Sequence, residues 1–103
     1  MRCLLHIRAQ VPGDWPGERR AELSRRQEEA AVELMRRKIL LRTFRVVGQS
    51  ANFSIWETDT LEELHAVLQS NPMYPFWKIT VIPIIKHPAE KAYEQRYGEL
   101  PPL

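Results

Sequence analysis

The sequence contains a single cysteine in 103 residues, which excludes an internal disulfide bond and a thiolate metal cluster. It also lacks a long apolar run. The longest, residues 79–85, has the length of a strand, whereas a membrane span needs about 20 apolar residues. Arg8 interrupts the apolar stretch near the start too early for a signal peptide. We therefore expect a cytoplasmic protein that does not insert into a membrane.

An excess of one charge is absent as well. Fifteen Lys and Arg residues face thirteen Asp and Glu residues, and this net charge of +2 is too small for a nucleic-acid-binding surface. The sequence has no GxGxxG, P-loop, HExxH or GxSxG motif. Nucleotide-binding, zinc-protease and serine-hydrolase functions therefore have no support.

Apolar residues make up 44% of the chain and charged residues 27%, a balance typical of a globular domain. A chain of this length buries only about two-thirds of the surface that it exposes when unfolded. We therefore expect part of any ligand pocket to come from another subunit.

The spacing of apolar residues predicts four strands and two helices. In chain order these are a strand at 3–11, a helix at 18–38, strands at 40–47 and 51–57, a short helix between Thr60 and Asn71, and a strand at 77–85. The order β-α-β-β-α-β predicts an α+β protein with a ferredoxin-like fold. We expect residues 1–88 to form one domain and residues 89–103 a C-terminal arm, which holds one short helix or lies on a neighbouring subunit.

The second and fourth predicted strands carry apolar residues on both faces. In the second, simple alternation places Leu40 and Phe44 on one face and Leu41 on the other. Two helices can cover only one face of a four-stranded sheet. We therefore expect a homo-oligomer in which two sheets pair through their uncovered faces.

Gln27 is an anomaly in the first helix, because it lies within an apolar stripe formed by Leu23, Ala30 and Leu34. A buried amide without hydrogen-bond partners costs about 1–3 kcal/mol. Gln27 is either satisfied by a backbone carbonyl or directed into a pocket above the sheet. Glu28 lies about 100° further round the helix, where it either reaches into the same cleft or is solvated.

Ser50, Asn52 and Ser54 alternate along the third strand and share one face. Three short polar groups in a row indicate either a lined cavity or a solvated edge with turn chemistry at Ser50. If this face packs under the first helix, Gln27 lies over Asn52. On the second strand, Arg42 and Arg45 either bind a substrate carboxylate or are surface charges.

Several short motifs occur with a spacing that matches a known family. They are Pro12 and Asp14, then Arg45-x-x-Gly48-x-x-Ala51-Asn52-x-Ser54, Leu64-His65-x-x-Leu68, Pro72-x-x-Pro75, Ile79-x-Val81 and His87-Pro88. In these positions taken together, the chain resembles the muconolactone delta-isomerase family without gaps over residues 3–88. The predicted domain at residues 1–88 is therefore muconolactone isomerase-like.

The resemblance implies a ferredoxin-like subunit that pairs into a dimeric α+β barrel and assembles into a homodecamer. It implies a cofactor-independent isomerase, an intramolecular oxidoreductase that transposes C=C bonds. The implied substrate is a small anionic lactone, whose double bond moves by proton transfer. The implied context is aromatic hydrocarbon catabolism through the beta-ketoadipate pathway. Such chemistry needs one base and hydrogen-bond donors, and no metal.

The family's functional residues carry over unevenly. Asn52 matches the family's amide on the third strand, whereas the catalytic carboxylate falls at Gln27 and a tyrosine hydroxyl at Ser50. An amide cannot act as a general base. We therefore expect Glu28 to be the proton shuttle, with Gln27, Ser50 and Asn52 as its hydrogen-bonding partners. Arg42, Arg45 and Ser54 are the expected substrate-binding residues.

Two other functions are consistent with these departures. The first is altered chemistry on the same fold, either a halolactone dehalogenase or an isomerase or cyclase of a biosynthetic pathway. The second is a non-catalytic binding subunit that has kept the fold.

Overall fold

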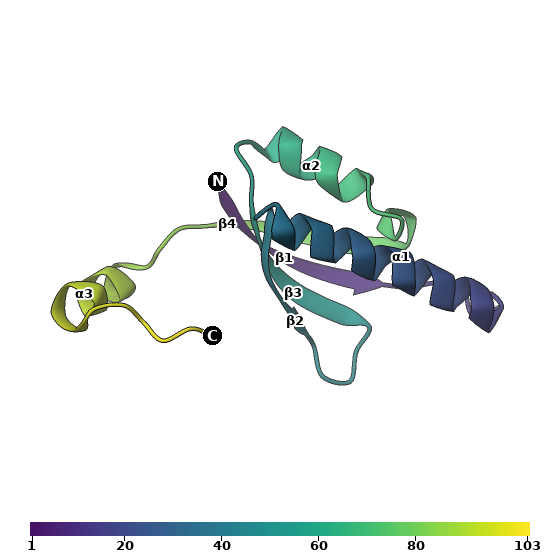
Figure 1. Ribbon diagram of the computed structural model, residues 1–103, viewed down its shortest axis with the longest axis horizontal. Helices are drawn as coiled ribbons and strands as arrows, with labels where there is room; N and C mark the ends of the chain where they lie inside the picture. Colours follow the sequence, from purple (N-terminus) through teal and green to yellow (C-terminus); the bar gives the residue numbers. More distant parts are fainter.

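The computed structural model describes all 103 residues and confirms the α+β, ferredoxin-like prediction. Its elements are β1 (Arg2–Ala9), α1 (Gly17–Arg36), β2 (Leu40–Arg45), β3 (Ala51–Glu57), α2 (Leu61–Gln69), the short 3-10 helix η1 (Tyr74–Phe76), β4 (Trp77–Ile84) and α3 (Pro88–Tyr97). The four strands form one sheet in the order β2-β3-β1-β4, and all neighbouring strands are antiparallel. Helices α1 and α2 lie on one side of this sheet, as Figure 1 shows.

The core lies between the sheet and these two helices. Along β1, the alternating side chains of Cys3, Leu5 and Ile7 are buried and face the helices. Leu34 of α1 and Leu64 of α2 belong to the same buried cluster. The period-two pattern of the strand and the helical spacing of the leucines therefore meet in one hydrophobic layer.

Both covering helices have a recognisable motif at one end, α2 at its start and α1 at its finish. Helix α2 begins with a side-chain cap, in which the Thr60 side chain accepts a hydrogen bond from the backbone N–H of Glu63 at 3.1 Å. Helix α1 ends at Arg36, where the N–H of Ile39 donates to the Leu34 carbonyl and that of Lys38 donates to the Met35 carbonyl. This Schellman motif places Lys38 at φ 61°, which ends the helix two residues before the predicted boundary.

A β-bulge in β2 corrects one prediction. The register shifts between Leu40 and Arg42, so that Leu40 pairs with Trp56 whereas Phe44 pairs with Phe53. Leu40 is therefore buried under the helices, and Phe44 lies on the opposite face of the sheet. Simple alternation had placed both on one face, and the extra residue of the bulge reverses the alternation beyond it.

The face of the sheet opposite α1 and α2, here called the open face, retains exposed apolar side chains. Phe44, Phe53 and Ile82 are 40%, 41% and 44% exposed. The rings of His6 and Phe53 stack on this face with their centroids 4.7 Å apart. Two helices thus leave one face of the sheet uncovered, as expected, and pairing with a second subunit remains a prediction.

The C-terminal segment stands apart from these layers (Figure 1). Of the two alternatives for residues 89–103, the structure shows a short helix, α3, and none of its residues is buried. None of the three helices has the length and apolar character that crossing a membrane requires.

The packing of α2 yields a matched pair of substitutions. Leu64 is 2% exposed and Leu61, on the same helix, is 45% exposed. We expect Leu64→Ala to lower the free energy of unfolding by about 2–5 kcal/mol, because it removes buried methyl groups and leaves a cavity. Leu61→Ala should cost less than about 1 kcal/mol. Urea denaturation at one fixed protein concentration measures both, and equal losses would contradict the placement of α2.

Candidate active site

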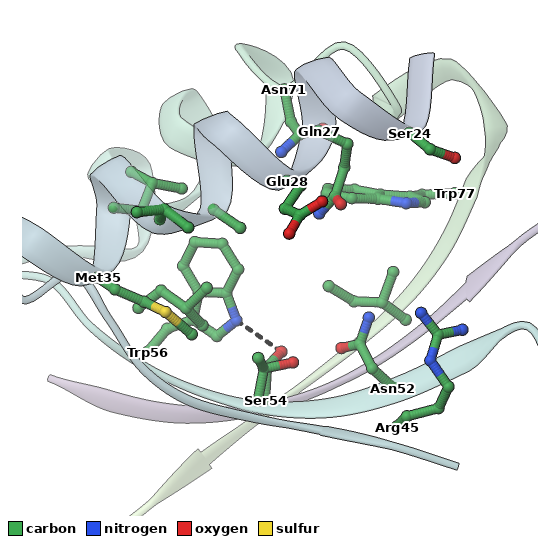
Figure 2. A pocket seen from close by; sticks show the side chains of 16 residues that line it. Ser24, Gln27, Glu28, Met35, Arg45, Asn52, Ser54, Trp56, Asn71 and Trp77 are labelled. Carbon is green, nitrogen blue, oxygen red and sulfur yellow. Dashed lines mark hydrogen bonds between the residues drawn. The ribbon is translucent and has the colours of Figure 1, made fainter. Parts of the chain in front are cut away.

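A cavity of about 600 Å³ lies between α1 and the covered face of the sheet. Side chains from α1, the four strands and the segment after α2 line it, as Figure 2 shows. Its polar lining consists of Ser24, Gln27, Glu28, Thr43, Arg45, Asn52, Ser54 and Asn71. The sequence therefore concentrates polar groups at one place on an otherwise apolar sheet face.

Helix α1 supplies the upper side of the cavity. Gln27 and Glu28 are consecutive, so they leave the helix about 100° apart. Figure 2 shows both side chains directed from α1 toward the sheet. Gln27 is half-buried, whereas Glu28 belongs to the exposed surface at the cavity's mouth. Their placement at the cavity agrees with the alternatives in which these two side chains reach a pocket.

Strands β2 and β3 supply the floor. Arg45 is the cross-strand partner of Asn52, and Thr43 is the partner of Ser54. Directly opposed residues on one face of an antiparallel pair have their side chains side by side. The bulge in β2 is what turns Thr43 and Arg45 toward α1, because it reverses the alternation of the strand after Leu40.

The side chain of Asn52 has an unsatisfied hydrogen-bond acceptor. Its Oδ1 atom is buried and accepts no hydrogen bond within the protein. The one other such side-chain oxygen, Oε2 of Glu57, lies 3.5 Å from Nε of Arg2. Buried polar groups are nearly always hydrogen-bonded. Asn52 is therefore a polar group in the cavity wall with capacity left for a ligand.

Ser54 has a partner inside the protein. The indole Nε1–H of Trp56 donates a hydrogen bond of 2.8 Å to Oγ of Ser54, and both residues are buried (Figure 2). The Ser54 hydroxyl keeps its own proton free to donate, because a hydroxyl is both donor and acceptor. This bond fixes the indole against the floor of the cavity.

Ser50 and Arg42 lie outside this cavity. Ser50 lines a smaller adjoining cavity of about 190 Å³ together with Gln27, Arg45 and Asn52. Arg42 pairs with Ile55 on the open face, and its Nη2 donates to the main-chain oxygen of Leu103 at 3.0 Å. The structure thus brings together Gln27, Glu28, Arg45, Asn52 and Ser54 around the main cavity, and it does not bring Arg42 there.

Asn71 is a lining residue that sequence reasoning assigned only to the end of a helix. It is buried, and its Oδ1 accepts a hydrogen bond from the backbone N–H of Met73 at 2.9 Å. Trp77, at the start of β4, closes the same end of the cavity. An Asn before a proline is common at helix ends, so the sequence around Asn71 indicates a helix end and does not indicate a residue that lines a cavity.

The charges of the lining are sparse. Glu28 is the only carboxylate and Arg45 the only cation among the lining residues, and no histidine or cysteine is present. No group of three or more His, Cys, Asp or Glu side chains in the chain is arranged to hold a metal ion. Glu28 is therefore the one carboxylate in the lining that can accept a proton, and Arg45 the one cation that can pair with an anion.

Hydrogen bonds from arginines lower the pKa of two carboxyls on the outer surface of α1. Arg25 does this for Glu22 and Arg36 for Glu33, and all four residues lie away from the cavity. These carboxylates are paired with arginines and do not line the main cavity, so Glu28 remains the one carboxylate there.

The contact between Ser54 and Trp56 predicts a stability effect. We expect Ser54→Ala to lower the free energy of unfolding by about 1–3 kcal/mol, because it leaves the buried indole N–H without an acceptor. Ser50→Ala is the matched control, since Ser50 is exposed. Thermal or urea unfolding measures both variants. A loss as large at position 50 as at position 54 would show that the hydrogen bond is not the cause.

Comparison with known proteins places the chain in a family. Residues 1–90 match the family described as muconolactone delta-isomerase. The muconolactone delta-isomerase of Cupriavidus pinatubonensis is 33% identical over 89 residues, which cover 86% of this chain and 97% of that protein. The protein of the same name from Rhodococcus opacus is 32% identical over 87 residues, which cover 82% and 94%.

Solved structures agree with this. The crystal structure of a muconolactone isomerase superposes with a TM-score of 0.81 at 26% identity, covering 86% of this chain and 93% of that one. A 5-chloro-2-hydroxyhydroquinone dehydrochlorinase from Burkholderia phenoliruptrix shares the fold, with a TM-score of 0.59 at 18% identity over 84% and 96% of the two chains. The resemblance inferred from the short motifs is confirmed, and this chain belongs to the muconolactone delta-isomerase family.

Proposed function

We propose that this protein is an isomerase that shifts a C=C bond within a small carboxylated lactone, with Glu28 as the group that moves the proton. Membership of the muconolactone delta-isomerase family supports the reaction class. The observation that carries the assignment of Glu28 is its isolation. It is the only carboxylate in a cavity whose other polar groups are amides, hydroxyls and one guanidinium.

The reaction needs a base and a stabilised anion. In an unsaturated lactone, a C–H conjugated with the carbonyl is acidic because its removal leaves an enolate with the charge on oxygen. Glu28 takes this proton and returns it to another carbon of the same conjugated system. The double bond moves, and the atoms and oxidation level of the substrate stay the same. Donors aimed at the enolate oxygen lower the barrier.

The other lining residues have roles that fit this step. Arg45 pairs with the carboxylate of the substrate, which places the lactone ring beneath α1. The side-chain N–H groups of Asn52 and Gln27 donate to the lactone carbonyl oxygen, on which the charge develops, and the Ser54 hydroxyl donates from the floor. Ser50 contributes from the adjoining cavity, which shares Gln27 and Asn52 with the main one. The proton transfer is redox-neutral, so no step of it needs a redox cofactor.

Replacing Glu28 tests the central role. We expect Glu28→Gln to lower kcat with a muconolactone-type substrate by about 10²- to 10⁴-fold, because the base is lost while the shape is kept. In deuterated buffer, the unmodified protein should introduce deuterium at carbon and the variant should not. Glu29→Gln is the control, because Glu29 does not line the main cavity. Retained turnover in Glu28→Gln would remove this residue from the mechanism.

The two arginines of β2 are expected to differ in their effect on substrate binding. We expect Arg45→Met to raise KM by about 10- to 100-fold, the cost of losing a charge-assisted hydrogen bond. Arg42→Met changes the same residue type on the opposite face of the strand, and KM should stay within about twofold of the original value. Steady-state kinetics with the same muconolactone-type substrate measures KM for both variants. A rise in KM for Arg42→Met alone would reverse the assignment.

Gln27 supports a second candidate reaction, elimination of a halide from a halogenated lactone. The position that the family resemblance assigns to a carboxylate holds an amide here, and it lines the cavity. An amide N–H stabilises a departing anion, which a second carboxylate would repel. Release of free chloride from a chlorinated lactone, measured beside isomerisation of the unsubstituted one, distinguishes the two reactions. A protein that turns over neither would be a binding subunit.

We also propose that the protein is a homo-oligomer that pairs through its open face. Phe44, Phe53 and Ile82 on this face are each about two-fifths exposed, and burying them against a copy of themselves removes them from water. Light scattering should give a mass that is a multiple of 12.1 kDa. A monomeric mass at micromolar concentration would contradict the pairing.

A further inference from the structure

Asn71 is held firmly in the wall of the main cavity, on the side of α1. The residue is 6% exposed. Its backbone N–H donates to the Leu68 carbonyl at 3.2 Å, and its own carbonyl accepts from the N–H of Tyr74 at 3.0 Å. Its side-chain Oδ1 accepts from the N–H of Met73 at 2.9 Å. Pro72 follows directly, and its ring fixes one backbone angle. Asn71 therefore has little freedom to turn.

These bonds decide which end of the Asn71 amide enters the cavity. Oδ1 faces the N–H of Met73, and turning the amide over would bring two donors together. The Nδ2 group is therefore the end left for the cavity that Asn71 lines. Nδ2 makes no hydrogen bond within the chain and is accessible from the cavity. Figure 2 shows this nitrogen directed toward the side of Gln27.

Asn71 differs in this respect from the other amides of the lining. Among the polar lining residues, only Ser54 and Asn71 have a side chain that forms a hydrogen bond within the chain. The amides of Gln27 and Asn52 are not held in this way and can rotate. A donor that is fixed before the reaction stabilises a developing charge without a cost of reorganisation. The cavity thus has one amide donor of fixed direction.

Gln27 and Asn71 bring two donors together from separate elements. Gln27 comes from α1, and Asn71 from the segment between α2 and η1. Two N–H donors that converge on one point are suited to an oxygen atom on which negative charge develops. Trp77 closes this end of the cavity (Figure 2), and a donor shielded from water interacts more strongly with a charge.

We propose that Asn71 is a further catalytic residue, whose Nδ2–H donates to the enolate oxygen of the substrate beside Gln27. This role rests on the proposed isomerisation, because that reaction places negative charge on the lactone carbonyl oxygen. Glu28 takes the proton from carbon, and the electron pair of the C–H bond moves through the conjugated system to this oxygen. When the proton returns to another carbon, the carbonyl is restored and the hydrogen bond from Asn71 weakens again.

A stable enolate tests this contact without turnover. Tetronate is a five-membered lactone that carries an enolate charge on oxygen, whereas paraconate has the same ring with a neutral carbonyl and a separate carboxylate. We expect Asn71→Ser to raise the dissociation constant of tetronate by at least about tenfold and that of paraconate by less than about threefold, because a charged acceptor gains more from a donor. Titration calorimetry measures both. Equal rises, no rise, or no tetronate binding by the unmodified protein would overturn the proposal.

Two further variants separate the contact from the fold. Asn71→Asp keeps the shape and the acceptor for the N–H of Met73 but replaces the donor by a carboxylate oxygen. It should keep the urea midpoint and bind tetronate no better than Asn71→Ser does, and tight tetronate binding would contradict the role. Ser70→Ala changes the preceding residue, which does not line the cavity. Both dissociation constants should then stay within about twofold of the original values.

Turnover distinguishes this role from the proposed function. With a muconolactone-type substrate, we expect Asn71→Ser to lower kcat by about 10²- to 10³-fold and to change KM by less than about threefold, because the donor acts mainly on the enolate. An unchanged kcat would overturn the role of Asn71 and leave the isomerisation intact. If the unmodified protein does not isomerise the substrate while its tetronate binding depends on Asn71, the isomerisation is wrong and the enolate contact stands.

Discussion

The arrangement of this protein follows from one constraint, that two helices can cover only one face of a four-stranded sheet. The covered face receives the core residues of β1 and, toward α1, the cavity with its polar lining. The uncovered face keeps phenylalanines and isoleucine that no single chain hides. The cavity and the exposed apolar side chains are therefore divided between the two sides of one sheet.

The parts of this arrangement that depend on local periodicity could be predicted from sequence. Alternation placed Asn52 and Ser54 on one face, helical spacing placed Gln27 above them, and the structure brings these residues to one cavity. The bulge in β2 could not be predicted in this way, because one extra residue changes the face of every later side chain without a distinct sequence signature. Asn71 was missed because its buried amide comes from a segment whose sequence reads only as a helix end. The exact roles of the lining residues remain predictions, since they depend on a substrate rather than on the fold.

The carboxylate of Glu28 stands one helix position after the amide of Gln27, and this difference changes the direction from which a carboxylate enters the cavity. Moving a carboxylate by one residue along a helix turns it by about 100° and shifts it by about 1.5 Å. In the proposed mechanism, a base at position 28 therefore approaches the lactone ring from a different side than one at position 27 would. It also stands nearer to solvent, since Glu28 is exposed where Gln27 is half-buried. Relocation of this kind alters which hydrogen of a substrate is within reach while the rest of the cavity stays the same.

The fixed indole of Trp56 gives the cavity an optical property. Two of the three tryptophans, Trp56 and Trp77, line the cavity, and the third, Trp15, lies under the guanidinium of Arg19 at 3.5 Å, outside it. Indole emission depends on the polarity and hydrogen bonding around the ring. A molecule entering the cavity displaces water next to two emitters and leaves the third as an internal reference. The protein therefore carries a native fluorescence sensor for whatever occupies its site.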